Sequence, residues 1–184
     1  MVTTPIRRKE DIKRLKDYFL GLKDYRDYAL FVAGINTALR ISDLLILKWK
    51  DIYNFEHDSY HEHIYVTEQK TGKNACVALN KNCLYAFELL KMSIHPESGE
   101  EYIFYSGKNR YTHISRNRAY HVIKKAALIL GLEGNISCHS LRKTFGYHAW
   151  KCGTPPALTM NIYNHSNIEI TKRYLSIDQD EKDA

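Results

Sequence analysis

A chain of 184 residues is long enough for one domain with a sizeable core, and its 44% hydrophobic and 26% charged residues argue against disorder. The net charge of +6 favours an anionic partner such as a phosphate backbone, although a basic soluble protein without such a partner would carry the same charge. No apolar run approaches the ~18 residues of a membrane helix, and the N-terminus lacks the apolar centre of a signal peptide. We therefore expect a cytoplasmic protein, associated with the nucleoid if its partner is DNA.

Hydrophobic periodicity predicts two helices near the N-terminus, over 10–22 and 26–39, and the second is apolar enough to be mostly buried. Ser42 and Asp43 then resemble the N-cap of a short helix that extends through Leu47. Arg40 is therefore expected at a junction between helices, where a buried element holds it in place.

Between residues 51 and 79 the pattern changes to short β-type runs separated by polar turns, at 52–53, 63–67 and 75–79. These runs predict a small three-stranded antiparallel sheet. In its tightest link Gly72 can take the positive φ of a hairpin turn, so Lys70 and Lys73 would project near the tip.

Helical patterns fill the rest of the chain, with breaks at glycine and proline, and predict helices over 82–92, 115–130, 139–151, 157–163 and 168–175. No internal repeat, low-complexity tract or interdomain linker interrupts them. The sequence therefore predicts a single α+β domain over 1–184, mainly helical, with the small sheet between helices.

Cysteines and histidines form no metal or redox pattern. The four cysteines contain no CxxC pair and are expected to be reduced thiols: Cys76, Cys83, Cys138 and Cys152. His57, His61 and His63 lie among acidic residues, but in an expected loop and strand rather than on a regular ligand scaffold, so a polar loop is favoured over a metal site. The segment 71–73 lacks the first glycine and four-residue spacer of a phosphate-binding P-loop. We expect no metal or nucleotide cofactor.

Two basic elements could each bind a phosphate. His139 and Arg142 are three residues apart and would share one face of a helix, although a solvated helix face would show the same spacing. Arg40 follows an apolar helix, where a solvent-facing arginine is less expected, and the alternative for it is a salt bridge with Asp43. Two guanidinium groups from distant positions match the two non-bridging oxygens of a phosphodiester.

Tyr174 lies in the closing segment and could serve as a nucleophile. A phenol with a pKa near ~10 is weak in that role, so it needs a base and strong electrostatic stabilisation of the transition state. His139 could accept its proton, and His165 could hydrogen-bond the phosphate. A leaving 5′-oxygen also needs a proton, which Lys70 in the hairpin could supply as general acid.

Together these residues resemble the catalytic domain of the tyrosine recombinase, or phage integrase, family. The resemblance covers nearly the whole chain and rests on Ala38-Leu39-Arg40-Ile41-Ser42-Asp43-Leu44, Gln69-Lys70-Thr71-Gly72-Lys73, His139-Ser-Leu-Arg142 and His165-Ser-Asn-Ile-Glu-Ile-Thr-Lys-Arg-Tyr174-Leu. It implies a site-specific DNA recombinase that works without metal. In this mechanism Tyr174 forms a 3′-phosphotyrosyl link with DNA, and the assisting residues are Arg40, Lys70, His139, Arg142 and His165.

The chain departs from the family pattern at two turns and at both ends. Asn164 and Ala38 stand where members commonly have glycine, and asparagine tolerates left-handed backbone geometry, so we expect the turn at Asn164 to survive. The N-terminal core-binding (SAM-like) domain that closes around DNA in most members is absent from 1–184, and the tail 176–184 is short and acidic. We expect a weakly associating monomer that self-assembles on double-stranded DNA. Met1 and a plausible lead-in favour a natural minimal recombinase over an excised fragment.

The hairpin tip and a basic stretch after Gly107 supply further candidates for phosphate contacts: Lys73, Lys108, Arg110, Arg116 and Arg118. A solvated loop and helix start would look the same. Three aromatic residues before this stretch are expected in the core rather than on bases: Tyr102, Phe104 and Tyr105. Two other functions fit the sequence: a topoisomerase of the type IB mechanism, and a DNA-binding regulator or fragment that is inactive on its own.

Overall fold

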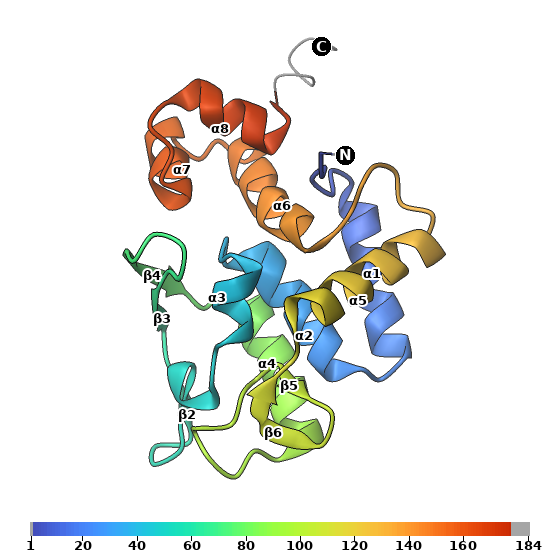
Figure 1. Ribbon diagram of the computed structural model, residues 1–184, viewed down its shortest axis with the longest axis vertical. Helices are drawn as coiled ribbons and strands as arrows, with labels where there is room; N and C mark the ends of the chain where they lie inside the picture. The colour runs from blue at the N-terminus through green and yellow to red at the C-terminus, as the bar shows by residue number, and fades with distance from the viewer. Residues whose placement is uncertain (1, 178–184) are drawn as a thin grey trace.

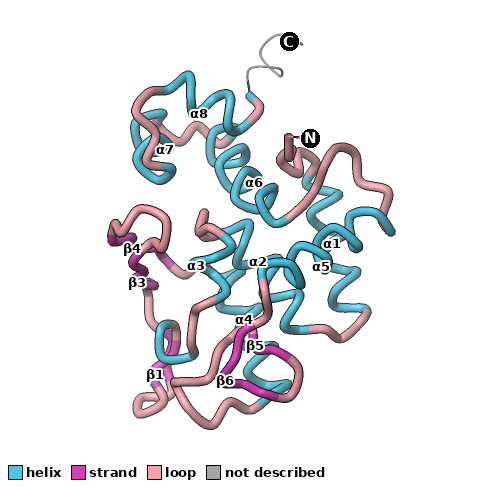
Figure 2. The backbone as a smooth tube through the Cα atoms, in the orientation of Figure 1, coloured by secondary structure: helices cyan, strands magenta, loops and turns pink. Residues whose placement is uncertain are grey.

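The computed structural model describes residues 2–177, in which helices pack around one central helix and short strand pairs lie at the periphery (Figures 1 and 2). The predicted class, mainly helical α+β, is confirmed. Within residues 2–177 no helix is both long and apolar enough to cross a membrane. Most of the expected acidic tail, from residue 178 onward, lies outside the described residues.

The N-terminal part holds α1 (Lys9–Gly21), α2 (Tyr25–Asn36), α3 (Ile41–Leu45) and the short 3-10 helix η1 (Trp49–Asp51). The first two agree with the predicted helices. The start of α3 differs from the prediction, because Arg40 is the N-cap and Ser42 and Asp43 lie inside the helix. The Asp43 carboxylate accepts the backbone N–H of Gln69 at 3.0 Å, so it ties α3 to the hairpin instead of capping the helix.

The strands form three separate antiparallel pairs rather than the predicted three-stranded sheet: β1 (Tyr53–Asn54) with β2 (Ser59–Tyr60), β3 (His63–Thr67) with β4 (Asn74–Ala78), and β5 (Tyr105–Ser106) with β6 (Asn109–His113). The β3–β4 hairpin forms as expected, and Gly72 has φ 67°. Each strand pairs with its neighbour along the chain, which closes the shortest loop and loses the least chain entropy. The β5–β6 hairpin lies in a stretch for which no strand was predicted.

The remaining helices agree with the predicted ones: α4 (Lys81–Ile94), α5 (Arg116–Ile129), α6 (Cys138–Lys151), α7 (Pro156–Tyr163) and α8 (Ile168–Leu175). Side-chain caps start α4, α5 and α8, since the oxygens of Asn80, Ser115 and Asn167 accept the backbone N–H groups of Cys83, Arg118 and Ile170.

The core is centred on α2, which packs against α1, α4 and α6. Its residues from Tyr28 to Ala33 are all buried, as the apolar run predicted. A smaller cluster joins α6, α7 and α8 through Ala38, Tyr147, Tyr163, Leu175 and Ile177. This second cluster holds α8 against α6, so side-chain packing fixes the place of Tyr174.

Candidate active site

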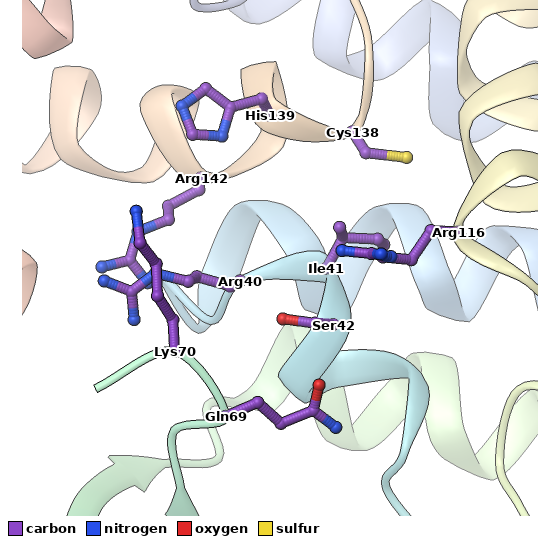
Figure 3. A pocket seen from close by; sticks show the side chains of 9 residues that line it. All are labelled: Arg40, Ile41, Ser42, Gln69, Lys70, Arg116, Cys138, His139 and Arg142. Atoms are coloured by element: carbon purple, nitrogen blue, oxygen red, sulfur yellow. The ribbon is translucent and has the colours of Figure 1, made fainter. Parts of the chain in front are cut away.

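Four of the predicted catalytic residues line one cavity of about 450 Å³, and they come from three separate segments: Arg40, Lys70, His139 and Arg142. Figure 3 shows the ends of Arg40, Lys70 and Arg142 gathered at one side of this cavity, with the His139 ring nearby on α6. Ile41, Ser42, Gln69, Arg116 and Cys138 complete the lining. The cavity concentrates positive charge, as a phosphate site requires.

Arg40 enters the cavity from the start of α3. The turn before it includes Ala38 in left-handed geometry at φ 56°. Its guanidinium pairs with Glu68, with Nη1 and Oε1 2.6 Å apart, and not with Asp43, the partner weighed from the sequence. The approach is close but out of line for a straight hydrogen bond.

Arg142 is buried, at 5% exposure, and its position is fixed from several sides. Its Nη1 donates to the carbonyl of Ala38, its Nη2 lies 3.5 Å from the carbonyl of Ile162, and its guanidinium stacks on the Tyr163 ring. The Tyr163 hydroxyl in turn donates to the Arg142 carbonyl at 2.6 Å. Such a fixed guanidinium needs little reorganisation to bind an anion.

His139 lies one helical turn before Arg142 and is partly open to solvent. Its ring meets the Tyr174 ring edge to face at a centroid distance of 5.3 Å. Partial burial and then the charges of Lys143 and Arg142 hold the pKa of His139 below its usual value. The imidazole therefore favours the neutral form, which can accept a proton.

Tyr174 lies on α8, close to α6, because Gly146 lets the two helices approach. A Cβ at Gly146 would lie 2.5 Å from Leu175 Cδ2 and from the Tyr163 hydroxyl. The Tyr174 hydroxyl is buried, and no group within residues 2–177 makes a well-formed hydrogen bond with it. Burial raises the pKa of Tyr174, while the neighbouring Arg142 guanidinium opposes that rise.

His165 follows the left-handed turn at Asn164, which has φ 58° as the sequence predicted. Its ring stacks on Tyr163, and its Nδ1 lies 3.0 Å from the Thr171 hydroxyl. Burial and then the charge of Arg142 lower the pKa of His165. The centroids of the His165 and Tyr174 rings are 5.2 Å apart, so the structure places His165 next to the predicted nucleophile.

Two charged residues at the site were missed from the sequence. Glu68 continues the buried face of β3, on which Ile64 and Val66 already lie, and the period of two along the strand could have revealed it. Lys143 lies four residues after His139 on α6, and that spacing could have placed it on the same face. Its ammonium lies 5.3 Å from the centroid of the Tyr174 ring.

The candidate DNA contacts are not gathered in one place. Arg116, at the first turn of α5, lines the cavity. Lys73 donates to the Asn164 side chain at 3.1 Å. Arg110 donates to the His95 carbonyl at 3.1 Å and to the Glu101 carboxylate at 3.2 Å, so its charge is already paired. The other two candidates, Lys108 and Arg118, are exposed.

Of the three aromatic residues expected in the core, Phe104 is buried as predicted, and Tyr102 and Tyr105 are partly exposed.

Residues 7–181 match the model of the phage integrase family, so the chain belongs to this family, the tyrosine recombinases. It is 42% identical over 183 residues to the probable integrase/recombinase YoeC of Bacillus subtilis (strain 168), covering 97% of this chain and 92% of that protein.

Two solved structures share the fold. The XerA recombinase has a TM-score of 0.72 and 22% identity, over 94% of this chain and 58% of that one. The XerH site-specific recombinase, solved in a post-cleavage complex with a palindromic difH substrate, has a TM-score of 0.72 and 18% identity, over 94% of this chain and 49% of that one. This chain therefore spans about half the length of these two proteins.

Proposed function

We propose that residues 1–184 form a single catalytic domain that cleaves and rejoins DNA at specific sites through a 3′-phosphotyrosyl intermediate. The observation that carries the proposal is the convergence of Arg40, Lys70, His139 and Arg142 on one cavity, with the Tyr174 phenol beside His139. Family membership supports the reaction class. A neutral imidazole next to a phenol, with two guanidinium groups close by, is an arrangement suited to attack by the phenol on a phosphodiester.

In cleavage, the Tyr174 oxygen attacks the phosphorus and its proton passes to His139. The bond between phosphorus and the 5′-oxygen breaks, and the leaving oxygen takes a proton from Lys70. Arg40 and Arg142 neutralise the charge that builds on the non-bridging oxygens, and His165 donates a hydrogen bond to one of them. The 3′-phosphate remains joined to the enzyme as a phosphodiester of tyrosine.

Rejoining reverses each step on a second DNA strand. The incoming 5′-hydroxyl gives its proton to Lys70 and attacks the phosphotyrosine, and the released phenolate takes its proton back from His139. One phosphodiester is exchanged for another, so no water and no nucleotide is consumed. The protein groups supply all the charge and proton transfer in this scheme, so we propose that no metal ion or other cofactor takes part.

Double-stranded DNA is the proposed substrate, at the nucleoid in the cell. XerH was solved on its own DNA substrate, which supports DNA as the ligand for the same fold here. Exchange between two sites requires at least two active sites, so we propose that the chain self-assembles on DNA. Ile177, the one strongly apolar residue of the tail, is buried within its own chain, consistent with a monomer in free solution.

The test is covalent trapping. The full chain is incubated, in a chelator, with nicked duplexes that carry a randomised segment. A short fragment downstream of the cleavage site diffuses away, so rejoining fails and the protein–DNA adduct accumulates. SDS-resistant adducts are recovered and the attached DNA is sequenced. We expect one enriched sequence, which then serves as the defined duplex for later measurements.

Tyr174→Phe should abolish the adduct but retain binding to the enriched duplex. Tyr85→Phe, at an exposed tyrosine on α4, should leave both the adduct and the binding unchanged. An undiminished adduct in Tyr174→Phe would refute the nucleophile. Exchange between two supplied duplexes would indicate a recombinase, and relaxation of a single supercoiled plasmid without exchange would indicate type IB topoisomerase activity instead.

A further inference from the structure

Glu68 is a buried carboxylate at the centre of the site, with an exposure of 4%. Besides its ion pair with Arg40, it accepts a hydrogen bond from the Thr71 hydroxyl at 2.6 Å. The Asn164 amide nitrogen lies 3.5 Å from the same carboxylate oxygen as Thr71. Three segments therefore meet at this one side chain.

The backbone of Glu68 also closes the hairpin turn. Its N–H donates to the Lys73 carbonyl at 2.9 Å, and its carbonyl accepts the N–H of Gly72 at 2.8 Å. Lys70 lies within this turn. Glu68 thus joins three segments that each carry a proposed catalytic residue: the start of α3 with Arg40, the hairpin with Lys70, and the turn before His165.

A negative charge is costly at this place. Burial by itself pushes the pKa of Glu68 up, but the paired Arg40 guanidinium and the hydrogen bond from Thr71 together outweigh it and hold the pKa below its usual value. The carboxylate therefore stays ionised next to a cavity suited to phosphate, where it repels an anion. An apolar side chain would fill the same volume without that repulsion.

We propose that Glu68 is a positioning residue, which orients the Arg40 guanidinium and holds the segments of Lys70 and His165 at the spacing that the scissile phosphate requires. This inference rests on the proposed function. A guanidinium has five N–H donors in a fixed plane, so a carboxylate at Nη1 leaves other donors for the phosphate and sets the direction in which they point.

Loss of the Glu68 carboxylate should therefore slow cleavage mainly when the scissile phosphate carries its negative charge. Glu68→Gln keeps the shape of the side chain but weakens the hold on Arg40, so we expect cleavage to slow by about 30-fold, with DNA affinity within about 3-fold of the unchanged chain. In a methylphosphonate one non-bridging oxygen is replaced by a methyl group, which removes the negative charge that Arg40 neutralises. On that substrate the difference between the two proteins should shrink to about 3-fold.

The experiment measures single-turnover adduct formation on the trapped duplex, made once with an ordinary scissile phosphate and once with a methylphosphonate. Glu101→Gln is the matched control, because Glu101 is also buried and pairs with an arginine, Arg110, but lies outside the cavity. It should leave both rates unchanged. Thr71→Val removes one hydrogen bond to Glu68 without touching Arg40, and it should give a smaller loss with the same substrate dependence.

Equal slowing of Glu68→Gln on both substrates would overturn the inference, because it would indicate general disruption of the fold. Faster cleavage or tighter binding would also overturn it and would mean that Glu68 competes with phosphate for Arg40. If Glu68→Gln does not fold, Thr71→Val is the deciding variant. Its slowing relative to the unchanged chain should then be larger on the ordinary phosphate than on the methylphosphonate, and equal slowing on both substrates would overturn the inference. An unchanged chain that forms no adduct would refute the proposed function itself, and this inference with it.

Discussion

The rings of His139 and Tyr174 meet edge to face, with centroids 5.3 Å apart and planes at 88°. The two residues come from α6 and α8, which the small cluster around Tyr163 and Leu175 holds together. This contact places a candidate base beside a candidate nucleophile.

The rate of adduct formation should rise with pH along a limb whose midpoint lies below about 6.5, the ordinary pKa of histidine. The pKa of His139 is lowered, so its neutral form, which accepts the phenol proton, persists to lower pH. Single-turnover rates between about pH 5 and pH 8 measure this limb. His139→Gln should lower the rate and remove the limb. A midpoint above the ordinary value would contradict the assignment of His139 as base.

Lys143→Met should move that limb to higher pH. Lys143 is the strongest electrostatic influence on His139 after burial, and removing its charge lets the pKa of His139 rise toward its usual value. Arg40, Lys70 and Arg142 remain, so the shift should be partial. Titration of the His139 ring proton by NMR reports the same change directly.

Lys143→Arg keeps the charge and should leave the limb in place. Lys124→Met is the control, since Lys124 on α5 donates to the neutral Asn135 side chain at 2.9 Å and is not among the charges that act on His139. A limb that stays in place in Lys143→Met would show that this ammonium does not act on His139.

Gly146→Ala should destabilise the fold by about 1 to 3 kcal/mol. It should also lower the rate of adduct formation by a larger factor than it lowers the affinity for DNA. The added methyl group would lie 2.5 Å from Leu175 and from the Tyr163 hydroxyl, so α8 must move away from α6 and take Tyr174 with it. Urea unfolding measures the stability. Gly21→Ala, where no neighbouring group among residues 2–177 lies within 4 Å of the new methyl group, should be neutral or stabilising.

Arg116→Ala should weaken DNA binding and reduce the slope of log affinity against log salt concentration by about 1. Arg116 lines the cavity, where its charge can displace a counterion from a DNA phosphate. Arg110→Ala should leave the slope unchanged, since its charge is paired within the protein. It should instead lower the stability, because the buried Glu101 carboxylate would lose its ion pair and keep only the backbone N–H groups of Glu97 and Ser98 as donors. Equal slopes for Arg116→Ala and the unchanged chain would contradict the contact.

The sequence predicted most helices well, because their apolar residues recur at helical spacing or, in α2, form a continuous buried run, and because polar or glycine residues mark their boundaries. It also predicted the left-handed turn at Asn164 and the hairpin turn at Gly72, since both depend on local backbone preferences. The three-stranded sheet was wrong in detail. Two-residue strands such as β1 carry almost no periodicity, so their pairing cannot be read from the residues alone.

The sequence by itself determined which groups are available, because the motifs around Arg40, His139 and Tyr174 record chemical type and order along the chain. Only the tertiary structure decided how their charges are partnered. Arg40 pairs with Glu68 and not with Asp43, because β3 delivers Glu68 to α3 from 28 residues further along the chain, while Asp43 is held by the amide of Gln69. Ion pairs and pKa shifts depend on distance in space and on burial, and local spacing in a sequence fixes neither of these.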